Sequence, residues 1–303
     1  MNLRCAVSPG PIAPVVAEAI TRAGGEVVDP DAAEALVWTD AYDPEGLAHL
    51  LATRSHIRWV QLPFAGVDRF GALFDDGRTW TSTKGAYSEP VAEHAVALGL
   101  AGLRQLPRRA RATSWGEPAG LRLTGSRVTV VGGGGITQAL LRLLAPFQVD
   151  ATVVRRHVAP IDGASRVVGP DELHDALAGA RLVVLALALT AETAGIISRT
   201  ELECMDEHAW LVNVARGAHV VTDDLVDALG NRRIGGATLD VTDPEPLPDG
   251  HALWSLDNCL VTPHTANTWQ MAEPLFAERV GANVGRYLAK EPLLGLVDPA
   301  LGY

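Results

Sequence analysis

The sequence predicts an α/β fold built on a doubly wound parallel sheet. From Arg127 onward, apolar strand candidates recur at regular intervals, and helix-compatible segments lie between most of them. The strand candidates begin near Val128, Ala151, Leu182, Leu211, Gly236 and Cys259. Several of them, such as VTVVGG, RLVVLALAL and WLVNVA, are apolar throughout, as strands buried on both faces are. Such strands joined by helical crossovers indicate one parallel sheet with helices on both faces.

The first hundred residues alternate in the same way, with weaker detail. Short β-like runs, CAV, ALVW and WVQL, are separated by helix-compatible stretches such as PVVAEAITRAGG, which Gly24 and Gly25 end. A long helix follows in SEPVAEHAVALGLAGLRQL, with Ser88 as its cap and Pro90 in its first turn. We therefore expect this part of the chain to be α/β as well.

Four later segments complete the expected elements. The stretch Arg104–Arg127 is polar and rich in arginine, which suits a linker or an arm. Ser198 and Glu201 have the spacing of a capping box at the start of a helix. Residues 241–250, VTDPEPLPDG, are expected to form a tight surface loop. After Thr268, a final helix in MAEPLFAERVGANVGRYLAKEP leads into the tail LLGLVDPALGY.

Length and composition limit the classes of function. The chain has 303 residues, which suggests two domains, and 48% hydrophobic with 20% charged residues excludes a disordered chain. A formal net charge of −11 disfavours nucleic acid and anionic membranes as partners. The cysteines, three in number and without CxxC spacing, argue against a disulfide framework and a cysteine-built metal site. Because no apolar run has the length of a signal peptide or membrane span, we expect a cytoplasmic protein.

A glycine-rich turn between a strand and a helix predicts a dinucleotide-binding site. In VTVVGGGGITQALLRLL, Gly132 permits the tight turn, and Gly134 lets a pyrophosphate approach bare backbone. The helix amino terminus that follows offers unpaired N–H groups to the anion. Thr137 stands where a third glycine is usual, which bears on helix–strand packing more than on phosphate contact.

The end of the second strand bears on which dinucleotide binds. An NAD site has an acidic residue there, about 20 residues after the first glycine, to bond the ribose 2′-hydroxyl. This chain has Arg155 and Arg156 instead, and two guanidinium groups suit a 2′-phosphate. The sequence therefore favours NADP(H) over NAD(H). The alternative is that both side chains are merely solvated, since arginine is abundant in this chain.

Three residues of complementary chemistry follow successive strands, on the side where open α/β sheets bind ligands. Arg216 ends WLVNVAR, Glu245 lies in LDVTDPEP, and His264 lies in LVTPHTAN. An arginine holds a carboxylate and polarises a carbonyl, and a histidine delivers a proton to the carbonyl oxygen. A neighbouring carboxylate keeps that histidine protonated. Other histidines, including His94 and His208 on expected helices, are interpreted as structural or surface residues.

Together these pieces resemble the D-2-hydroxyacid dehydrogenase family over nearly the whole chain. The matching segments are VAEHAVAL, VVGGGGI, LTAET, VNVARG, LDVTDPEPLP and TPHTAN. Within the family, the short chain and its terminal Gly302-Tyr303 resemble the glyoxylate/hydroxypyruvate reductases of the GhrA type. The chain departs from the family pattern at Thr137 and at Asn267, where a small residue is usual after the histidine.

The resemblance implies a role for each matching position. The implied catalytic residues are Arg216, Glu245 and His264. The expected cofactor contacts are Gly132, Gly134, Gly135, Ile136, Arg155, Arg156, Thr190, Ala215, Asp240 and His264, with Asp240 against the nicotinamide. The expected substrate contacts are Ala65, Gly66, Arg216, His264 and Trp269. The backbone amides of the loop at Ala65 and Gly66 would hold the substrate carboxylate, whereas core packing is an equal alternative for Trp269.

The resemblance also implies an interleaved architecture. A flavodoxin-like substrate domain would comprise residues 1–97 and 270–303, with the dinucleotide-binding domain, 98–269, between them. Residues 104–125 would be the arm of a homodimer, in which Trp115 enters the partner's substrate pocket or packs in the interface. The arginines of this arm are interpreted as a solvated or interface surface rather than a nucleic-acid patch.

The leading hypothesis is an NADP-preferring reductase that converts a small 2-oxo acid to the D-2-hydroxy acid, with His264 as general acid. The alternative is a non-enzymatic, dinucleotide-sensing interaction protein on the same scaffold. A formate-dehydrogenase-like role is disfavoured, because Glu245 stands where that branch has glutamine. The sequence does not name the substrate, whose pocket would be shaped by loops such as 62–68 and the segment from 269 onward.

Overall fold

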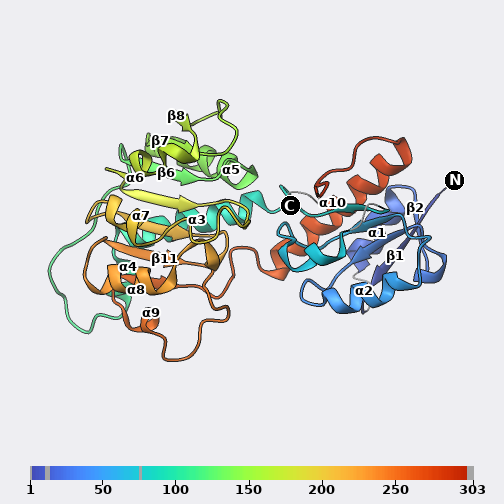
Figure 1. Ribbon diagram of the computed structural model, residues 1–303, viewed down its shortest axis with the longest axis horizontal. Coiled ribbons are helices and arrows are strands. Elements are labelled where there is room, and N and C mark those ends of the chain that lie inside the picture. Colours follow the sequence, from blue (N-terminus) through green and yellow to red (C-terminus); the bar gives the residue numbers. More distant parts are fainter. Residues whose placement is uncertain (1, 11–13, 75–76, 299–303) are drawn as a thin grey trace. The chain divides into compact units, whose positions relative to one another are not determined.

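The structure is a computed structural model that describes residues 2–10, 14–74 and 77–298. It divides into two units, each built on a parallel sheet (Figure 1). The first unit comprises Met1–Tyr87 and Thr268–Tyr303, and the second comprises Ser88–Asn267. The expected α/β class with a doubly wound parallel sheet is confirmed.

The two crossings between the units lie at 87/88 and 267/268, whereas the sequence suggested 97/98 and 269/270. The first crossing comes earlier because the long helix that begins at Ser88 makes its main packing contacts with elements of the second unit. Which unit holds substrate and which holds dinucleotide stays a prediction.

The first unit contains a five-stranded parallel sheet in the order β2-β1-β3-β4-β5, which is the flavodoxin-like order. Its strands are β1 (Leu3–Ser8), β2 (Gly25–Val27), β3 (Ala35–Trp38), β4 (Trp59–Gln61) and β5 (Thr79–Thr81). Its α-helices are α1 (Pro14–Arg22), α2 (Pro44–Ala52) and α10 (Trp269–Ala289). Short 3₁₀ turns lie at Pro30–Ala32 and Asp68–Leu73.

Helices α1 and α10 pack together on this sheet and bury its apolar side chains. Val16 and Ile20 of α1 meet Phe276, Val280 and Val284 of α10, all of them fully buried. The final helix of the chain is thereby part of the core of the first unit, although it is the last element in the sequence.

The second unit contains a seven-stranded parallel sheet in the order β12-β11-β10-β9-β6-β7-β8. Its strands are β6 (Arg127–Val131), β7 (Asp150–Val154), β8 (Arg166–Val168), β9 (Leu182–Leu185), β10 (Trp210–Asn213), β11 (Gly236–Leu239) and β12 (Cys259–Val261). The direction of winding reverses between β6 and β9, as in dinucleotide-binding folds. The six predicted strands are all present, and β8 is an additional short strand at the sheet edge.

Helices cover this sheet, and several of them begin as the sequence indicates. They are α3 (Ser88–Leu103), α4 (Leu106–Ala110), α5 (Gly135–Leu144), α6 (Leu173–Leu177), α7 (Arg199–Cys204), α8 (Thr222–Gly230) and α9 (Ala252–Ser255), with 3₁₀ turns at Ala145–Phe147, Pro170–Glu172 and Gly217–His219. The predicted capping box is present at the start of α7, where Oε2 of Glu201 accepts from the Ser198 amide at 3.0 Å and from the Ser198 hydroxyl at 2.6 Å. Helix α3 lies against α5 and β10.

The segment 104–125 contains α4 and then runs without regular structure. It returns to α3 where the Leu121 amide donates to the Leu103 carbonyl at 2.7 Å. Between these points Trp115 is 96% exposed, and Leu106 of α4 is also exposed. Over the described ranges, no helix combines the length and apolar character needed to cross a membrane.

Candidate active site

The predicted functional residues of the second unit gather at one edge of its sheet, where the parallel strands end. The glycine-rich turn follows β6, Arg155 follows β7, and Arg216 follows β10. Asp240 follows β11 and His264 follows β12. This carboxyl edge is where open α/β sheets bind ligands. The topology therefore brings together residues that are far apart in the sequence.

His264 and Glu245 form a direct pair at this edge. Nδ1 of His264 lies 2.7 Å from Oε1 of Glu245, and their side chains are 44% and 33% exposed. His264 has a left-handed backbone with φ of +52°, and its amide bonds the carbonyls of Asp240 at 2.8 Å and Thr262 at 2.9 Å. Since Glu245 occupies Nδ1, Nε2 is the ring nitrogen of His264 that can bond another group.

Asp240 lies beneath the loop that carries His264, and its side chain is only 1% exposed. Its Oδ1 accepts from the Thr262 hydroxyl at 2.6 Å and from the Thr265 amide at 2.9 Å, and its Oδ2 accepts from the Ala266 amide at 3.0 Å. Burial alone raises the pKa of the Asp240 carboxyl, but hydrogen bonds from His94, Thr262 and these amides outweigh it and lower the pKa to about 2. Asp240 is therefore an ionised, buried anchor for this loop.

His94 is a member of this arrangement that sequence reasoning assigned no more than a structural or surface role. Its Nε2 lies 3.1 Å from Oγ1 of Thr262 and 3.2 Å from Oδ1 of Asp240, and its side chain is 22% exposed. His208, which was grouped with it, lies in a turn rather than a helix and is 68% exposed. The two histidines look alike in the sequence because nothing local shows that His94 faces Asp240.

Arg216 lies at the end of β10 and is half-buried. Its guanidinium Nη1 donates to the carbonyl of Ala215 at 2.7 Å, and Nδ2 of Asn213 donates to the Arg216 carbonyl at 2.9 Å. The Arg216 amide lies 3.2 Å from Nδ1 of His219, a wholly buried residue whose Nε2 lies 3.3 Å from the carbonyl of Ala188. His219 was missed by sequence reasoning, although ARGAHV places it only three residues after Arg216.

The glycine-rich turn has the open backbone that a pyrophosphate needs. Gly132 has φ of +111°, and a Cβ there would lie 2.2 Å from the carbonyl oxygen of Ala186. A Cβ at Gly134 would meet nothing within 4 Å, so space is open in front of the amino terminus of α5 at Gly135 and Ile136. The turn therefore fits a dinucleotide phosphate.

Thr137 replaces the usual third glycine without loss of close packing. It is fully buried, and its Oγ1 donates to the carbonyl of Gly132 at 2.9 Å. The hydroxyl thus ties the first turn of α5 back to the turn that precedes it. The expected disturbance of helix–strand packing is offset by this hydrogen bond.

Arg155 and Arg156 have different surroundings. A Cβ on Gly133 would lie 2.8 Å from both Cδ and Nε of Arg155, so the Arg155 side chain lies directly over the glycine-rich turn. Nη2 of Arg156 instead pairs with Oε2 of Glu192 at 2.5 Å, and both of these side chains are largely exposed. Of the two arginines, Arg155 is therefore the one that lies against the glycine-rich turn.

The remaining predicted cofactor residues lie in loops at the same edge. After β9, the Thr190 amide donates to Oγ1 of Thr193 at 2.8 Å. After β10, the Ala215 amide donates to Oδ1 of Asn213 at 3.0 Å, and Ala215 is buried. Asn267, the departure noted in the sequence, has a buried Oδ1 without a hydrogen-bond partner among the described residues.

The predicted substrate residues Ala65, Gly66 and Trp269 belong to the first unit. Ala65 and Gly66 lie in the loop after β4, at the carboxyl edge of that sheet. Trp269 is the first residue of α10 and is 44% exposed, so the core-packing alternative for its side chain is not supported. The terminal Gly302-Tyr303 lies outside the described residues.

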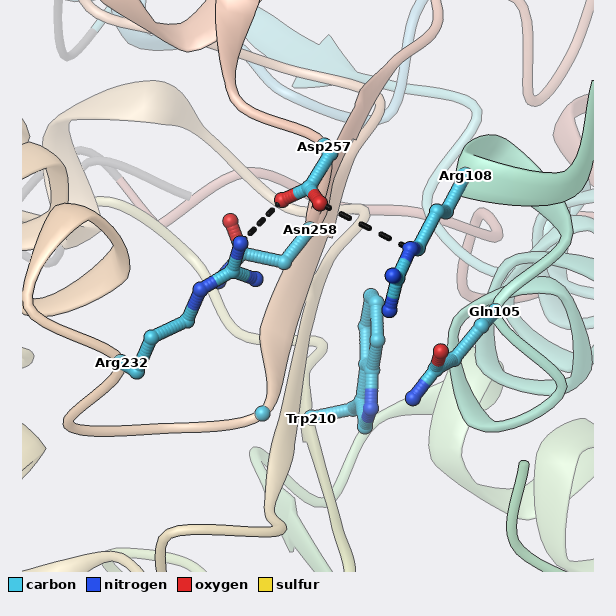
Figure 2. A pocket seen from close by; sticks show the side chains of 7 residues that line it. Gln105, Arg108, Trp210, Arg232, Asp257 and Asn258 are labelled. Carbon is cyan, nitrogen blue, oxygen red and sulfur yellow. Dashed lines mark hydrogen bonds and ion pairs between the residues drawn. The ribbon is translucent and has the colours of Figure 1, made fainter. Parts of the chain in front are cut away.

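A small cavity lies at the opposite end of the second sheet, around the amino ends of β10, β11 and β12 (Figure 2). It is lined by Gln105, Arg108, Trp210, Arg232, Gly235, Asp257 and Asn258. Asp257 pairs there with both arginines, as Figure 2 shows. Its interior volume of about 40 Å³ suits a few water molecules rather than a dinucleotide. In the parts of the chain that the structure describes, no group of three or more His, Cys, Asp or Glu residues is placed to hold a metal.

Sequence comparison connects this chain with known proteins. The profile of the family described as D-isomer specific 2-hydroxyacid dehydrogenase, NAD binding domain, matches residues 95–266. A human protein named glyoxylate reductase/hydroxypyruvate reductase is 34% identical over 224 residues, which cover 70% of this chain and 67% of the human one. A glyoxylate/hydroxypyruvate reductase A from Serratia proteamaculans is 28% identical over 284 residues, which cover 89% and 87% of the two chains.

Structural comparison gives the same relationship. A D-isomer specific 2-hydroxyacid dehydrogenase from Xanthobacter autotrophicus Py2, solved in complex with NADPH and MES, has a TM-score of 0.85 and 29% sequence identity to this chain. The match covers 100% of this chain and 99% of the other. Both units therefore have counterparts in that protein.

Proposed function

This chain belongs to the D-isomer specific 2-hydroxyacid dehydrogenase family, and on that basis we propose that it reduces a small 2-oxo acid to the D-2-hydroxy acid with NADPH. The observation that carries the proposal is the 2.7 Å contact between His264 and Glu245, at the sheet edge that also holds Arg216 and the glycine-rich turn. A proton donor, an anion-binding arginine and a phosphate-binding turn are the groups that this reduction needs. No observation favours a non-enzymatic sensor.

His264 is the general acid of the proposed reaction. Bound NADPH supplies the hydride that adds to the carbonyl carbon of the substrate. Nε2 of His264 gives its proton to the carbonyl oxygen, so that the carbonyl becomes a hydroxyl group. Glu245 stabilises the protonated imidazole through Nδ1 and fixes the ring's orientation.

Arg216 orients the substrate in the proposed reaction. Its guanidinium binds the substrate carboxylate and polarises the carbonyl, which a planar fork of donors does better than an ammonium group. The backbone amides at Ala65 and Gly66 are proposed to bind the substrate carboxylate, and Trp269 is proposed to contact the substrate. Their exposure at a loop and at a helix start supports this assignment.

Two observations support the preference for NADPH. Arg155 lies over Gly133 of the glycine-rich turn, and we assign its guanidinium to the 2′-phosphate. The Xanthobacter autotrophicus protein, similar over the whole chain, was solved with NADPH. We assign the pyrophosphate to Gly132, Gly134, Gly135 and Ile136, with Thr190, Ala215 and Asp240 on the nicotinamide side.

Glyoxylate and hydroxypyruvate are the proposed substrates, because two relatives that match most of this chain carry the name of glyoxylate/hydroxypyruvate reductases. We also propose a homodimer formed through residues 104–125, supported by the full exposure of Trp115 on an extended arm. A sedimentation experiment that finds only monomer at micromolar concentration would remove the dimer. Location in the cytoplasm is proposed because all three cysteines are free.

The proposed activity is tested by following NADPH and NADH oxidation with glyoxylate, hydroxypyruvate, pyruvate and phenylpyruvate. We expect turnover with at least one acid and a higher kcat/KM for NADPH. His264→Gln removes the general acid and should lower kcat by roughly 10²- to 10⁴-fold. His208→Gln, at an exposed turn, is the matched control and should leave kcat unchanged. Turnover of none of the four acids, or near-normal turnover by the His264 variant, contradicts the proposal.

A further inference from the structure

His94, Thr262 and Asp240 form a closed set of hydrogen bonds beneath the His264 loop. The Thr262 hydroxyl donates to Oδ1 of Asp240 at 2.6 Å, so this hydroxyl can only accept from the His94 ring. Nε2 of His94 lies within 3.2 Å of both oxygens, and neither oxygen has a hydrogen to offer it. His94 therefore carries its hydrogen on Nε2 and donates to this pair.

The carboxylate of Asp240 needs that donor. It is buried and ionised, and a buried charge is costly unless hydrogen bonds compensate for its lost hydration. Four groups point at it, two of them backbone amides at Thr265 and Ala266, and the other two the side chains of Thr262 and His94. Without the His94 donor, the carboxylate is undercompensated, and its hold on the two amides weakens.

Those two amides directly follow His264, whose own amide bonds the carbonyl of Asp240. His264 has φ of +52°, a left-handed conformation that is uncommon for a residue with a side chain. The Asp240 carboxylate accepts hydrogen bonds from the amides of Thr265 and Ala266, the two residues after His264, and these bonds constrain that conformation. The direction of the imidazole toward Glu245 depends on this backbone conformation.

We propose that His94 is a positioning residue, which holds the backbone at 264–266 through Asp240 and thereby sets the orientation of the general acid His264. This inference rests on the proposed function for its catalytic part. This role differs from that of a cofactor contact, because Nε2 of His94 bonds two protein atoms, the buried Oδ1 of Asp240 and Oγ1 of Thr262.

The hydrogen-bonded residues His94, Thr262 and Asp240 also connect two segments that lie next to the crossings between the units. His94 lies in the second turn of α3, which starts directly after the first crossing between the units, at 87/88. Ala266 lies directly before the second crossing, at 267/268. The hydrogen bonds of Asp240 therefore tie the first helix after one crossing to the last loop before the other.

The experiment compares His94→Leu with His94→Gln. Leucine fills the space of the ring on a helix without a donor, whereas the glutamine amide places an N–H near the position of Nε2. Glu93→Gln, at an exposed neighbour on the same helix, is the control. Thr262→Val, which removes the hydroxyl between His94 and Asp240, is a second route to the same effect if His94→Leu does not fold.

Two readouts are measured on the full-length protein. The first is hydrogen–deuterium exchange of the peptide 262–268 in the free protein, which we expect His94→Leu to accelerate by about tenfold or more. The second is steady-state kinetics, in which kcat should fall by about 10- to 10²-fold while KM for NADPH changes little. His94→Gln should restore both, and Glu93→Gln should alter neither.

Each result decides the matter. If hydrogen–deuterium exchange of the peptide 262–268 is unchanged in His94→Leu, or if the leucine and glutamine variants change it equally, the proposal that His94 holds the backbone at 264–266 is wrong. Faster exchange with unchanged kcat overturns the effect on the general acid. If the unaltered protein reduces no 2-oxo acid, the proposed function fails, while the exchange data still decide whether His94 holds residues 264–266.

Discussion

At the scale of single residues, Arg155 and Arg156 show how adjacent side chains of one type acquire different roles. Arg155 lies over Gly133 and forms no ion pair with any residue in the described part of the chain. Arg156 pairs with Glu192 at the surface. A 2′-phosphate would gain most from Arg155, because Arg156 must share its charge with a carboxylate.

We therefore expect Arg155→Ala to lower kcat/KM for NADPH by roughly 10- to 100-fold, since a hydrogen bond between charged groups contributes about 1.5–3 kcal/mol. The value for NADH should change little, because NADH lacks the 2′-phosphate. Arg156→Ala is the matched variant and should have the smaller effect on NADPH. A larger loss in the Arg156 variant would show that the ion pair with Glu192 opens when the cofactor binds.

Thr137 gives a second prediction for a single hydroxyl. Thr137→Val keeps the shape of the side chain but removes the donor to the Gly132 carbonyl, a bond of 2.9 Å at a fully buried site. The free energy of unfolding should fall by about 1 kcal/mol, measured by urea denaturation. Thr137→Ser retains the hydroxyl and should lose less. Equal stability of the valine variant and the parent protein would mean that this bond adds nothing.

The residues that sequence reasoning found and missed differ in one respect. Arg216, Glu245 and His264 each follow a strand, so their meeting at one edge follows from parallel topology alone. His94 lies on a helix and bonds Thr262, which is 168 residues away. No local pattern reports such a contact, because it depends on how α3 packs against the sheet.

At the scale of elements, strands were predictable where burial on both faces made them apolar. The runs at β6, β9 and β10 are buried at nearly every position. The strands that were missed, GEV in β2, TWT in β5 and RVV in β8, are three residues long and contain charged or polar residues. Each of these segments forms a strand because it pairs with a neighbouring strand of its sheet, and that pairing is a tertiary effect.

Helix α3 supplies a prediction at this scale, because Gly102 lets it approach Trp210 on β10. A Cβ on Gly102 would lie 2.4 Å from Cε3 of Trp210, well inside contact distance. Alanine is favoured over glycine in a helix by about 1 kcal/mol, whereas overpacking costs about 1–3 kcal/mol. The clash should exceed the gain, so we expect Gly102→Ala to lower the midpoint of urea unfolding.

Gly285 in α10 is the matched control, since a Cβ there would meet nothing within 4 Å. Gly285→Ala should be neutral or stabilising by up to about 1 kcal/mol. Stabilisation by both substitutions would mean that α3 can shift away from the sheet. That result would also question how rigidly α3 holds His94 against Asp240.

At the scale of the whole molecule, acid changes the charge of the entire protein. The chain has 36 acidic residues against 25 lysines and arginines, and its net charge of −11 becomes positive once the carboxylates are protonated. Repulsion among the remaining cations destabilises the folded state of any such protein. The contribution of one buried carboxylate therefore has to be measured as a difference between two proteins that share this background.

Asp240 should make that difference measurable. Its pKa of about 2 in the folded protein lies below the ordinary 3.8, so the carboxylate adds stability at pH values above 3.8. That stability is lost as the pH falls through about 2, and the shift corresponds to roughly 2 kcal/mol. Asp240→Asn cannot be protonated there. Urea unfolding of both proteins between pH 5 and pH 2 should show a steeper loss for the parent protein, by about that amount. Parallel curves would mean that the hydrogen bonds from His94, Thr262 and the two amides do not hold an ionised carboxylate in solution.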